Sequence, residues 1–188
     1  DGSPMKLSVA IITKNEEANI ARCLKSVSWA DERIVLDSNS TDKTVQIAKE
    51  HGAIVHNAEW EGFGKAKQHV IELTTGDWIL SLDADEEVTE PLAEEMQRVI
   101  SSSSDIVGYY MKRRNLFLNR WISHCGWYPD YTLRLFKRDH GKFDLAIVHE
   151  ELLIDGRTAF LNGELRHYNY PSMALYLERS NRYTTHGA

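Results

Sequence analysis

The sequence predicts an α/β fold, in which a mostly parallel sheet flanked by helices is followed by a mixed β region. Over the first 100 positions, short runs rich in β-branched residues begin roughly every 20–25 residues. Between these runs, apolar residues recur at the three- and four-residue spacing of amphipathic helices. Such alternation of strands and helices is typical of a parallel sheet with helices on both faces.

Four strands and four helices are expected in this first part. The expected strands are, in order, Lys6–Ile12, Arg33–Leu36, a run from Ala53, and Trp78–Leu82. The expected helices carry their apolar residues around Ile20–Val27, Val45–Ala48, Ala66–Leu73 and Leu92–Val99. Asn15 is expected to cap the first helix, and Thr89 the last, with Pro91 in its first turn.

The second part of the chain has a strand-like pattern. Its expected strands are Ile106–Lys112, Tyr131–Phe136, Phe143–Val148 and Leu152–Ile154. An amphipathic helix is expected at Ser172–Thr185. We therefore divide the chain into a βα half, residues 5–100, and a second half of the same domain, residues 101–188.

Composition limits the classes of function. The 188 residues carry a net charge of −6, divided into −9 for residues 1–100 and +3 for residues 101–188. The acidic first half speaks against a nucleic-acid-binding protein. Cys23 and Cys125 fit no metal-binding spacing, and the N-terminal residues do not resemble a secretory signal. A cytoplasmic protein is therefore expected, with Cys23 as a core residue.

Ligands of parallel α/β sheets bind beyond the carboxyl ends of the strands. Asp83-Ala84-Asp85 directly follows a buried strand, where two carboxylates can converge on Mg²⁺ or Mn²⁺ that also binds phosphate. The alternative is a solvated acidic turn before the last helix. Asp37 ends the second strand and is a candidate to bind a nucleoside, and its alternatives are an Asx-type turn or the N-cap of the helix after Thr41.

Three further residues carry weaker signals. Lys67 follows a glycine turn and is either a phosphate ligand or a surface lysine of its helix. Asp130, among aromatic residues, is a candidate base, and its alternatives are a turn aspartate or the partner of Arg134 in an ion pair. His149 is a candidate third metal ligand or a structural histidine. No glycine-rich dinucleotide or Walker-type motif occurs in the sequence.

A basic and aromatic segment lies in the second half. Residues 112–121 include Arg113, Arg114 and Arg120 beside phenylalanine and tryptophan. Such a segment suits an anionic acceptor or a lipid surface, or else it forms a strand with a charged outer face.

Taken together, these stretches resemble inverting family 2 glycosyltransferases with the Rossmann-like GT-A fold. The resemblance is carried by residues 8–17, residues 34–42 and residues 78–86, which occur in the family's order and at its spacing. Residues 60–64, 126–130 and 148–150 are most similar to the lipopolysaccharide core β-1,4-glucosyltransferase (WaaE/KdtX) group. Lys67-Gln68 stands where many members have Arg-Asn, and Pro129-Asp130 where many have Glu-Asp.

The resemblance implies a metal-dependent transfer of a hexose from a UDP-sugar to a glycan or glycolipid, at the inner face of a membrane. The implied donor and cofactor ligands are Thr13, Asn15, Glu17, Asp37, Lys67, Asp83 and Ala84. The implied metal ligands are Asp83, Asp85 and His149, and Asp130 is the implied base. Many relatives are longer, so a truncated chain is also expected. The alternatives are a nucleotide-binding module without turnover and a sugar-phosphate nucleotidyltransferase, although the latter would have a glycine-rich loop after its first strand.

Overall fold

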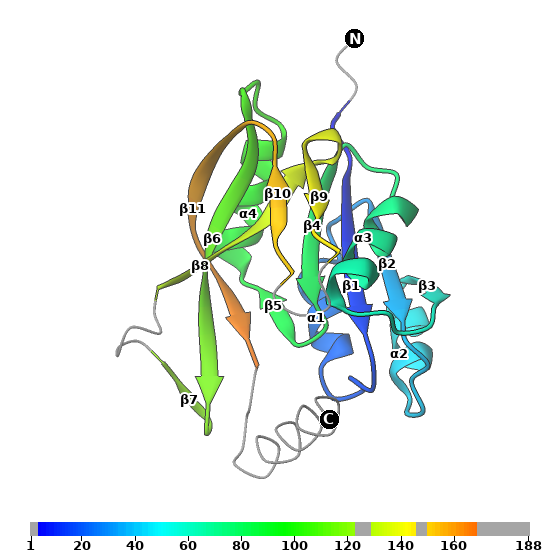
Figure 1. The fold of residues 1–188 in the computed structure, drawn as a ribbon. Helices are drawn as coiled ribbons and strands as arrows, with labels where there is room; N and C mark the ends of the chain where they lie inside the picture. The colour runs from blue at the N-terminus through cyan, green and yellow to red at the C-terminus, as the bar shows by residue number, and fades with distance from the viewer. Residues whose placement is uncertain (1–3, 123–128, 146–149, 169–188) are drawn as a thin grey trace.

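One large sheet organises the molecule. The computed structural model describes residues 4–122, 129–145 and 150–168 (Figure 1). The nine-stranded sheet has the strand order β3-β2-β1-β4-β8-β6-β11-β5, and β7 pairs with β6 outside this path. A second sheet contains only β10 and β9.

The four strands and four helices predicted for the first part of the chain are all present. The strands are β1 (Leu7–Thr13), β2 (Glu32–Asp37), β3 (Ile54–Asn57) and β4 (Trp78–Asp83). The helices are α1 (Ile20–Ser26), α2 (Thr44–Glu50), α3 (Phe63–Leu73) and α4 (Glu90–Ile100). β1 pairs in parallel with β2 and β4, and β2 in parallel with β3. All seven residues of β1 are buried, as its continuous apolar run predicts.

Helices cover the two faces of the sheet, each with its own core. On one face, α1, α2 and α4 bury Leu24, Ala48 and Met96 against β1 and β4. On the other face, α3 buries Ala66 and Val70 together with side chains of β1 and β2. The predicted core residue Cys23 is fully buried in the first core. Both cores therefore hold the strand ends of β1, β2 and β4 in fixed positions.

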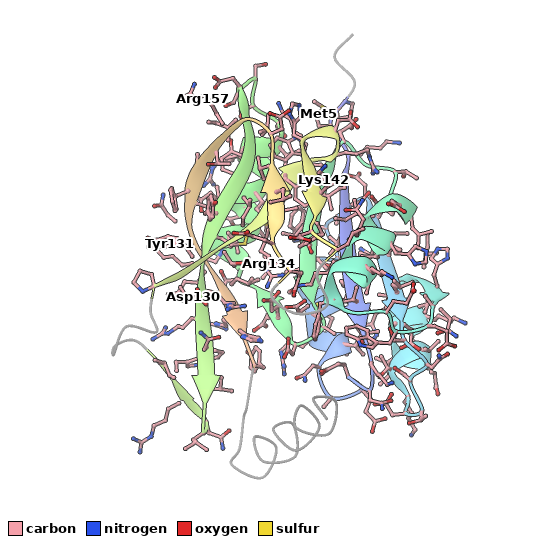
Figure 2. The ribbon with its side chains drawn as sticks, viewed as in Figure 1. Met5, Asp130, Tyr131, Arg134, Lys142 and Arg157 are labelled. Carbon is pink, nitrogen blue, oxygen red and sulfur yellow. The ribbon has the colours of Figure 1, made fainter. Side chains whose placement is uncertain are left out.

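The second half of the chain extends the sheet with mixed strands. Its strands are β6 (Ile106–Phe117), β7 (Arg120–Trp121), β8 (Asp130–Lys137), β9 (Gly141–Phe143), β10 (Leu152–Ile154) and β11 (Arg157–His167). The short strand β5 (Glu86–Val88) comes earlier in the chain, between β4 and α4. A 3₁₀ turn (Arg138–His140) joins β8 to β9. β8 is antiparallel to both β4 and β6. Figure 2 shows Asp130 and Arg134 on β8, away from Arg157 at the other end of the sheet.

Several sequence expectations need correction here. The strand predicted at Phe143–Val148 ends at Phe143 in the described part, and residues 146–149 lie outside it, as does the helix predicted at Ser172–Thr185. The sequence pattern missed β5 and the 11-residue β11. Polar residues around Gly163 interrupt the alternation of β11, and its register with β6 shifts between Phe160 and Glu164.

Asn15 does not cap the first helix. Its backbone is left-handed, with φ of 52°, and α1 begins only at Ile20 with Asn19 as N-cap. Asparagine tolerates this conformation better than most residues, so the same preference for turns misled the cap prediction. Thr89 is the N-cap of α4 as predicted, but its hydroxyl donates to the carbonyl of Glu164 on β11, at 2.6 Å.

In the described part of the chain, no helix has the length and apolar character needed to cross a membrane.

Substitution of Gly163 by alanine is expected to destabilise the fold by about 1–3 kcal/mol, as overpacking commonly does. A Cβ at this position would lie 2.6–2.8 Å from backbone and Cβ atoms of Leu92 on α4, which cannot move independently. The measurement is the midpoint of urea unfolding. Gly108→Ala is the matched control, because its Cβ would meet only flexible side-chain atoms, at 3.3–3.6 Å. Equal midpoints for the two variants would contradict the expectation.

Candidate functional site

The register of the sheet brings the predicted site residues to one edge. Thr13 pairs with Asp37 across β1 and β2, and Ile12 pairs with Asp83 across β1 and β4. Asp37 and Asp83 therefore flank the end of β1, roughly 10 Å apart, which is twice the spacing between strands. A ligand lying across these strand ends would span both carboxylates.

The loops after β1 and β2 are joined by hydrogen bonds. The Asn15 side chain accepts the Thr41 backbone N–H at 2.8 Å, and the Glu17 carboxylate accepts the Lys43 N–H at 3.0 Å. The buried Asp37 carboxylate accepts the Ser40 N–H at 2.9 Å and also the Ser40 hydroxyl. Asp37 thus forms the Asx-type turn that the sequence offered as the alternative to nucleoside binding. Asn15 and Glu17 connect the two loops by hydrogen bonds.

An open hollow of about 480 Å³ lies beside these loops. Its lining comes from the ends of β2 and β3 and the start of α2, and includes Asp37, Ser40, Val45 and Asn57. Thr13, at the neighbouring strand end, is buried, and its hydroxyl has no hydrogen-bond partner among the described residues. The edge of the sheet at Asp37 therefore combines polar groups with a hollow that is large enough for a ligand.

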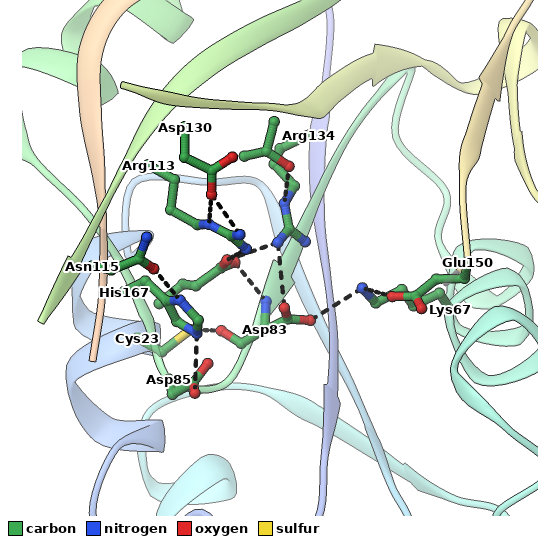
Figure 3. Close-up of polar contacts among 12 residues, drawn as sticks. Cys23, Lys67, Asp83, Asp85, Arg113, Asn115, Asp130, Arg134, Glu150 and His167 are labelled. Atoms are coloured by element: carbon green, nitrogen blue, oxygen red, sulfur yellow. Dashed lines mark hydrogen bonds and ion pairs between the residues drawn. The ribbon is translucent and has the colours of Figure 1, made fainter. Parts of the chain in front are cut away.

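Asp83 lies at the centre of a dense cluster of charges (Figure 3). Its Oδ1 lies 3.4 Å from the Lys67 ammonium and its Oδ2 3.3 Å from Arg134 Nη2. Burial by itself disfavours the carboxylate, but the positive charges of Lys67, Arg134 and His167 outweigh it and hold the pKa of Asp83 well below its usual value. Asp83 is therefore a carboxylate whose charge is already balanced by protein groups.

Lys67 is not a surface lysine. Only 7% of its side chain is exposed, and its ammonium donates to Glu150 at 2.6 Å in addition to the Asp83 contact. Lys65, two positions earlier in the same turn of α3, is half-exposed and pairs with Glu61. Burial between two carboxylates places the charge of Lys67 at the carboxyl end of β4.

Asp85 meets a histidine that sequence reasoning missed. The imidazole Nε2 of His167 lies 3.3 Å from Asp85 Oδ2, and its Nδ1 lies 2.7 Å from Asn115 Oδ1 (Figure 3). In the imidazolium form, Nδ1–H donates to Asn115 and Nε2–H donates to Asp85, and loss of the second proton would free Nε2 to bind a cation. His167 ends β11, so the missed strand explains the missed residue. Burial opposes the imidazolium, but the hydrogen bond and charge of Asp85 raise the pKa of His167.

The sequence candidate His149 falls outside the described residues. Ala84, between the two aspartates, is buried in the core shared with α1 and α4.

Glu86 is a fully buried carboxylate just behind the two aspartates. Its Oε1 lies 2.7 Å from Arg134 Nη2 and 3.7 Å from Arg113 Nη1, and its Oε2 accepts the Asp83 backbone N–H at 2.9 Å. Burial raises the pKa of Glu86, and the charge of Asp83 adds to this effect, whereas Arg134 opposes it. Nothing in the sequence pattern distinguished Glu86 from its neighbour Glu87.

Asp130, the candidate base, pairs with Arg113 and not with Arg134. Arg113 Nε and Nη2 both donate to Asp130 Oδ2, at 2.9 and 2.6 Å. The carboxylate is 37% exposed, so solvent and ligands can reach it. Arg134 instead pairs with Asp83 and Glu86. The predicted ion pair between Asp130 and Arg134 is therefore wrong, and Arg113 takes the place of Arg134.

Asp85 and His167 are suitable ligands for a divalent cation whose remaining coordination positions are filled by a bound substrate. Among the described residues, no group of three or more His, Cys, Asp or Glu side chains could hold a metal ion. The Asp85 carboxylate and the His167 imidazole nevertheless face each other, and Mg²⁺ or Mn²⁺ commonly takes only one or two protein ligands when phosphates supply the rest. These residues therefore fit a cation that binds together with a diphosphate.

The fold is similar to that of solved glycosyltransferases. S. aureus TarS 1-349, solved in complex with UDP-GlcNAc, matches with a TM-score of 0.62 and 17% identity over 92% of this chain and 61% of that chain. The glucosyl-3-phosphoglycerate synthase of Mycobacterium tuberculosis, solved with Mn²⁺, UDP and glucosyl-3-phosphoglycerate, matches with a TM-score of 0.61 and 20% identity over 94% of this chain and 75% of that chain.

Sequence comparison identifies the family. An uncharacterized glycosyltransferase of Rickettsia typhi is 32% identical over 97% of this chain and 67% of its own length. The lipopolysaccharide core biosynthesis glycosyltransferase LpsC of Rhizobium meliloti is 29% identical over 96% of this chain and 70% of its own. The chain thus spans roughly two thirds of these relatives. Since residues 8–182 also match the family model described as Glycosyl transferase family 2, this chain belongs to that family of glycosyltransferases.

Proposed function

We propose that this chain transfers a hexose from a UDP-sugar to a hydroxyl group of a glycan or glycolipid, with inversion at the anomeric carbon. The observation that carries the proposal is the group of side chains around the end of β4. It combines the facing Asp85 and His167, the buried Lys67, and an accessible carboxylate on Asp130. This set supplies a cation site, a charge for the leaving group and a base.

The donor is proposed to lie across the ends of β2, β1 and β4. Asp37 and Thr13 would bind the nucleoside, and the loops held by Asn15 and Glu17 would frame it. Lys67 would exchange Glu150 or Asp83 for the diphosphate. Structural relatives solved with UDP-GlcNAc and with UDP support this donor class.

Asp85 and His167 are proposed to hold Mg²⁺ or Mn²⁺, with Asp83 beside them. A bound cation would stabilise the negative charge that develops on the departing UDP. Asn115 keeps the imidazole in the orientation that ligation needs, a common arrangement for histidine ligands. His149, proposed from the sequence as a ligand, lies outside the described residues.

Asp130 is proposed to remove the proton from the acceptor hydroxyl. The acceptor oxygen then bonds to the anomeric carbon on the face opposite the diphosphate, and the bond from that carbon to the phosphate oxygen breaks. The products are the new glycoside and UDP, and the proton is on Asp130. One displacement of this kind inverts the anomeric configuration.

The two halves of the chain are proposed to divide the substrates. Residues 5–100 would bind the donor, and residues 101–188, with the basic Arg113, Arg114 and Arg120, would face an anionic acceptor. The relative LpsC makes a lipopolysaccharide core the first acceptor to test. An acceptor of this kind would bring the protein to the inner face of a membrane.

A panel of UDP-sugars with Mn²⁺ tests the proposal. One donor is expected to be hydrolysed slowly alone and to transfer its sugar to lipopolysaccharide core when that acceptor is added, measured as release of UDP and by mass spectrometry of the product. Binding of UDP in calorimetry without turnover of any donor would favour the nucleotide-binding module. Release of pyrophosphate from a nucleoside triphosphate and a sugar phosphate would favour the nucleotidyltransferase.

A further inference from the structure

We propose that Arg113 is the positioning residue of Asp130, and that buried Glu86 fixes Arg113 and the Asp83–Asp85 turn together. The inference rests on the proposed role of Asp130 as the base. It assigns a task to two residues that neither the sequence pattern nor the transfer mechanism required.

The contact between Arg113 and Asp130 restricts one carboxylate oxygen only. The two residues are directly paired in the antiparallel register of β6 and β8, so their backbones are held by the sheet. Both guanidinium nitrogens donate to Oδ2. Oδ1 receives no hydrogen bond from any described residue, and Figure 3 shows it pointing away from Arg113. Such a fork orients the carboxylate and leaves one oxygen for a proton.

Glu86 connects this fork to the proposed metal site. Its Oε1 faces the guanidinium groups of Arg113 and Arg134, and its Oε2 holds the backbone N–H of Asp83. The side chain is fully buried, and a buried carboxylate requires compensating partners. Two arginines from β6 and β8 and one amide of the turn supply them. One rigid group therefore sets the base and the turn relative to each other.

The charges favour the same assignment. Arg113 places a positive charge beside Asp130, with its Nη2 2.6 Å from Asp130 Oδ2. Glu86, 3.7 Å from the same guanidinium, offsets part of that positive charge. Asp130 is thus oriented by Arg113, and the positive charge of Arg113 is partly balanced by the carboxylate of Glu86.

Arg113→Ala is expected to lower kcat about 10- to 100-fold, the order of loss that follows from a misplaced catalytic group. The KM for the UDP-sugar and the Kd for UDP with Mn²⁺ should change less than about twofold, because Arg113 contacts none of the residues that are proposed to bind the donor. Guanidinium chloride at millimolar concentration should restore a large part of kcat by filling the vacated site. A residue that serves folding alone would show neither the selective loss of kcat nor the rescue.

Controls separate the inference from the proposed function. Arg157→Ala, on an exposed arginine paired with Asp105 at the other end of the sheet, should keep full activity with or without guanidinium. Asp130→Ala should lose activity without rescue. Unchanged kcat in Arg113→Ala, while Asp130→Ala is inactive, would overturn the positioning role alone. Full activity of Asp130→Ala would instead overturn the proposed base.

Glu86→Gln tests the second half of the inference. It keeps the shape of the side chain but removes the charge that faces two arginines, so kcat is expected to fall about 5- to 20-fold, in the range of an imperfectly positioned group. If Arg113→Ala melts below the assay temperature, Arg113→Lys replaces it, because lysine keeps the charge without the two-pronged contact. Full activity of a folded Arg113→Lys and of Glu86→Gln would contradict the proposal.

Discussion

Replacement of Asp85 by alanine is expected to abolish Mn²⁺-dependent turnover of the UDP-sugar. Asp85 is the carboxylate that faces His167 Nε2 at 3.3 Å, whereas Asp83 is already balanced by Lys67 and Arg134. A metal at the leaving diphosphate contributes several kcal/mol, so kcat should fall roughly 10³-fold. The measurements are steady-state release of UDP and the Kd of Mn²⁺ in the presence of UDP.

A matched variant at the other end of β4 controls for the loss of a carboxylate. Asp77 accepts the Lys6 backbone N–H at 2.8 Å, far from the charged cluster, so Asp77→Ala should retain activity and Mn²⁺ affinity. His167→Ala should weaken Mn²⁺ binding in the same direction as Asp85→Ala. Full activity of Asp85→Ala, or activity of the unaltered protein after removal of metal with EDTA, would contradict the proposed cation site.

The second large effect is expected for Asp130→Asn. The amide keeps a contact with Arg113 but cannot accept the acceptor proton, so kcat for transfer should fall about 10²- to 10⁴-fold, the usual contribution of a general base. Affinity for UDP with Mn²⁺ should stay unchanged, because Asp130 lies on β8 and contacts no proposed donor ligand. Transfer to the acceptor is measured together with calorimetric binding of UDP.

Asp139 provides the control for Asp130. It lies in the 3₁₀ turn directly after β8, at the opposite end of that strand. Asp139→Asn should therefore transfer sugar at the rate of the unaltered protein. Equal rates for Asp130→Asn and Asp139→Asn would remove Asp130 from the mechanism and leave the base to be found among other carboxylates.

The strands that the sequence predicted well are those with continuous apolar runs. β1, β2 and β4 are buried on both faces, so their composition alone distinguishes them from helices and loops. The polar residues that end them were visible for the same reason. Asp37, Asp83 and Asp85 could therefore be assigned to one edge of the sheet before the fold was known.

The strands of the second half were harder to predict because polar and apolar residues do not alternate regularly along them. β11 contains Asn162, Gly163 and Glu164 in its middle, and the sequence does not show that α4 packs against that segment. The same gap concealed His167, whose relation to Asp85 depends on the pairing of β11 with β5 and β6.

The sequence by itself determined the family, the parallel half of the sheet and the acidic strand ends, since these follow from local apolar runs and adjacent polar residues. Only the tertiary structure decided the partners: Lys67 with Asp83 and Glu150, His167 with Asp85, and Arg113 with Asp130. These residues are separated by 16 to 83 positions, and each pair meets because a particular strand register or helix packing brings it together. Charge pairing in a buried site depends on distances of a few ångströms, which no local pattern of residues encodes.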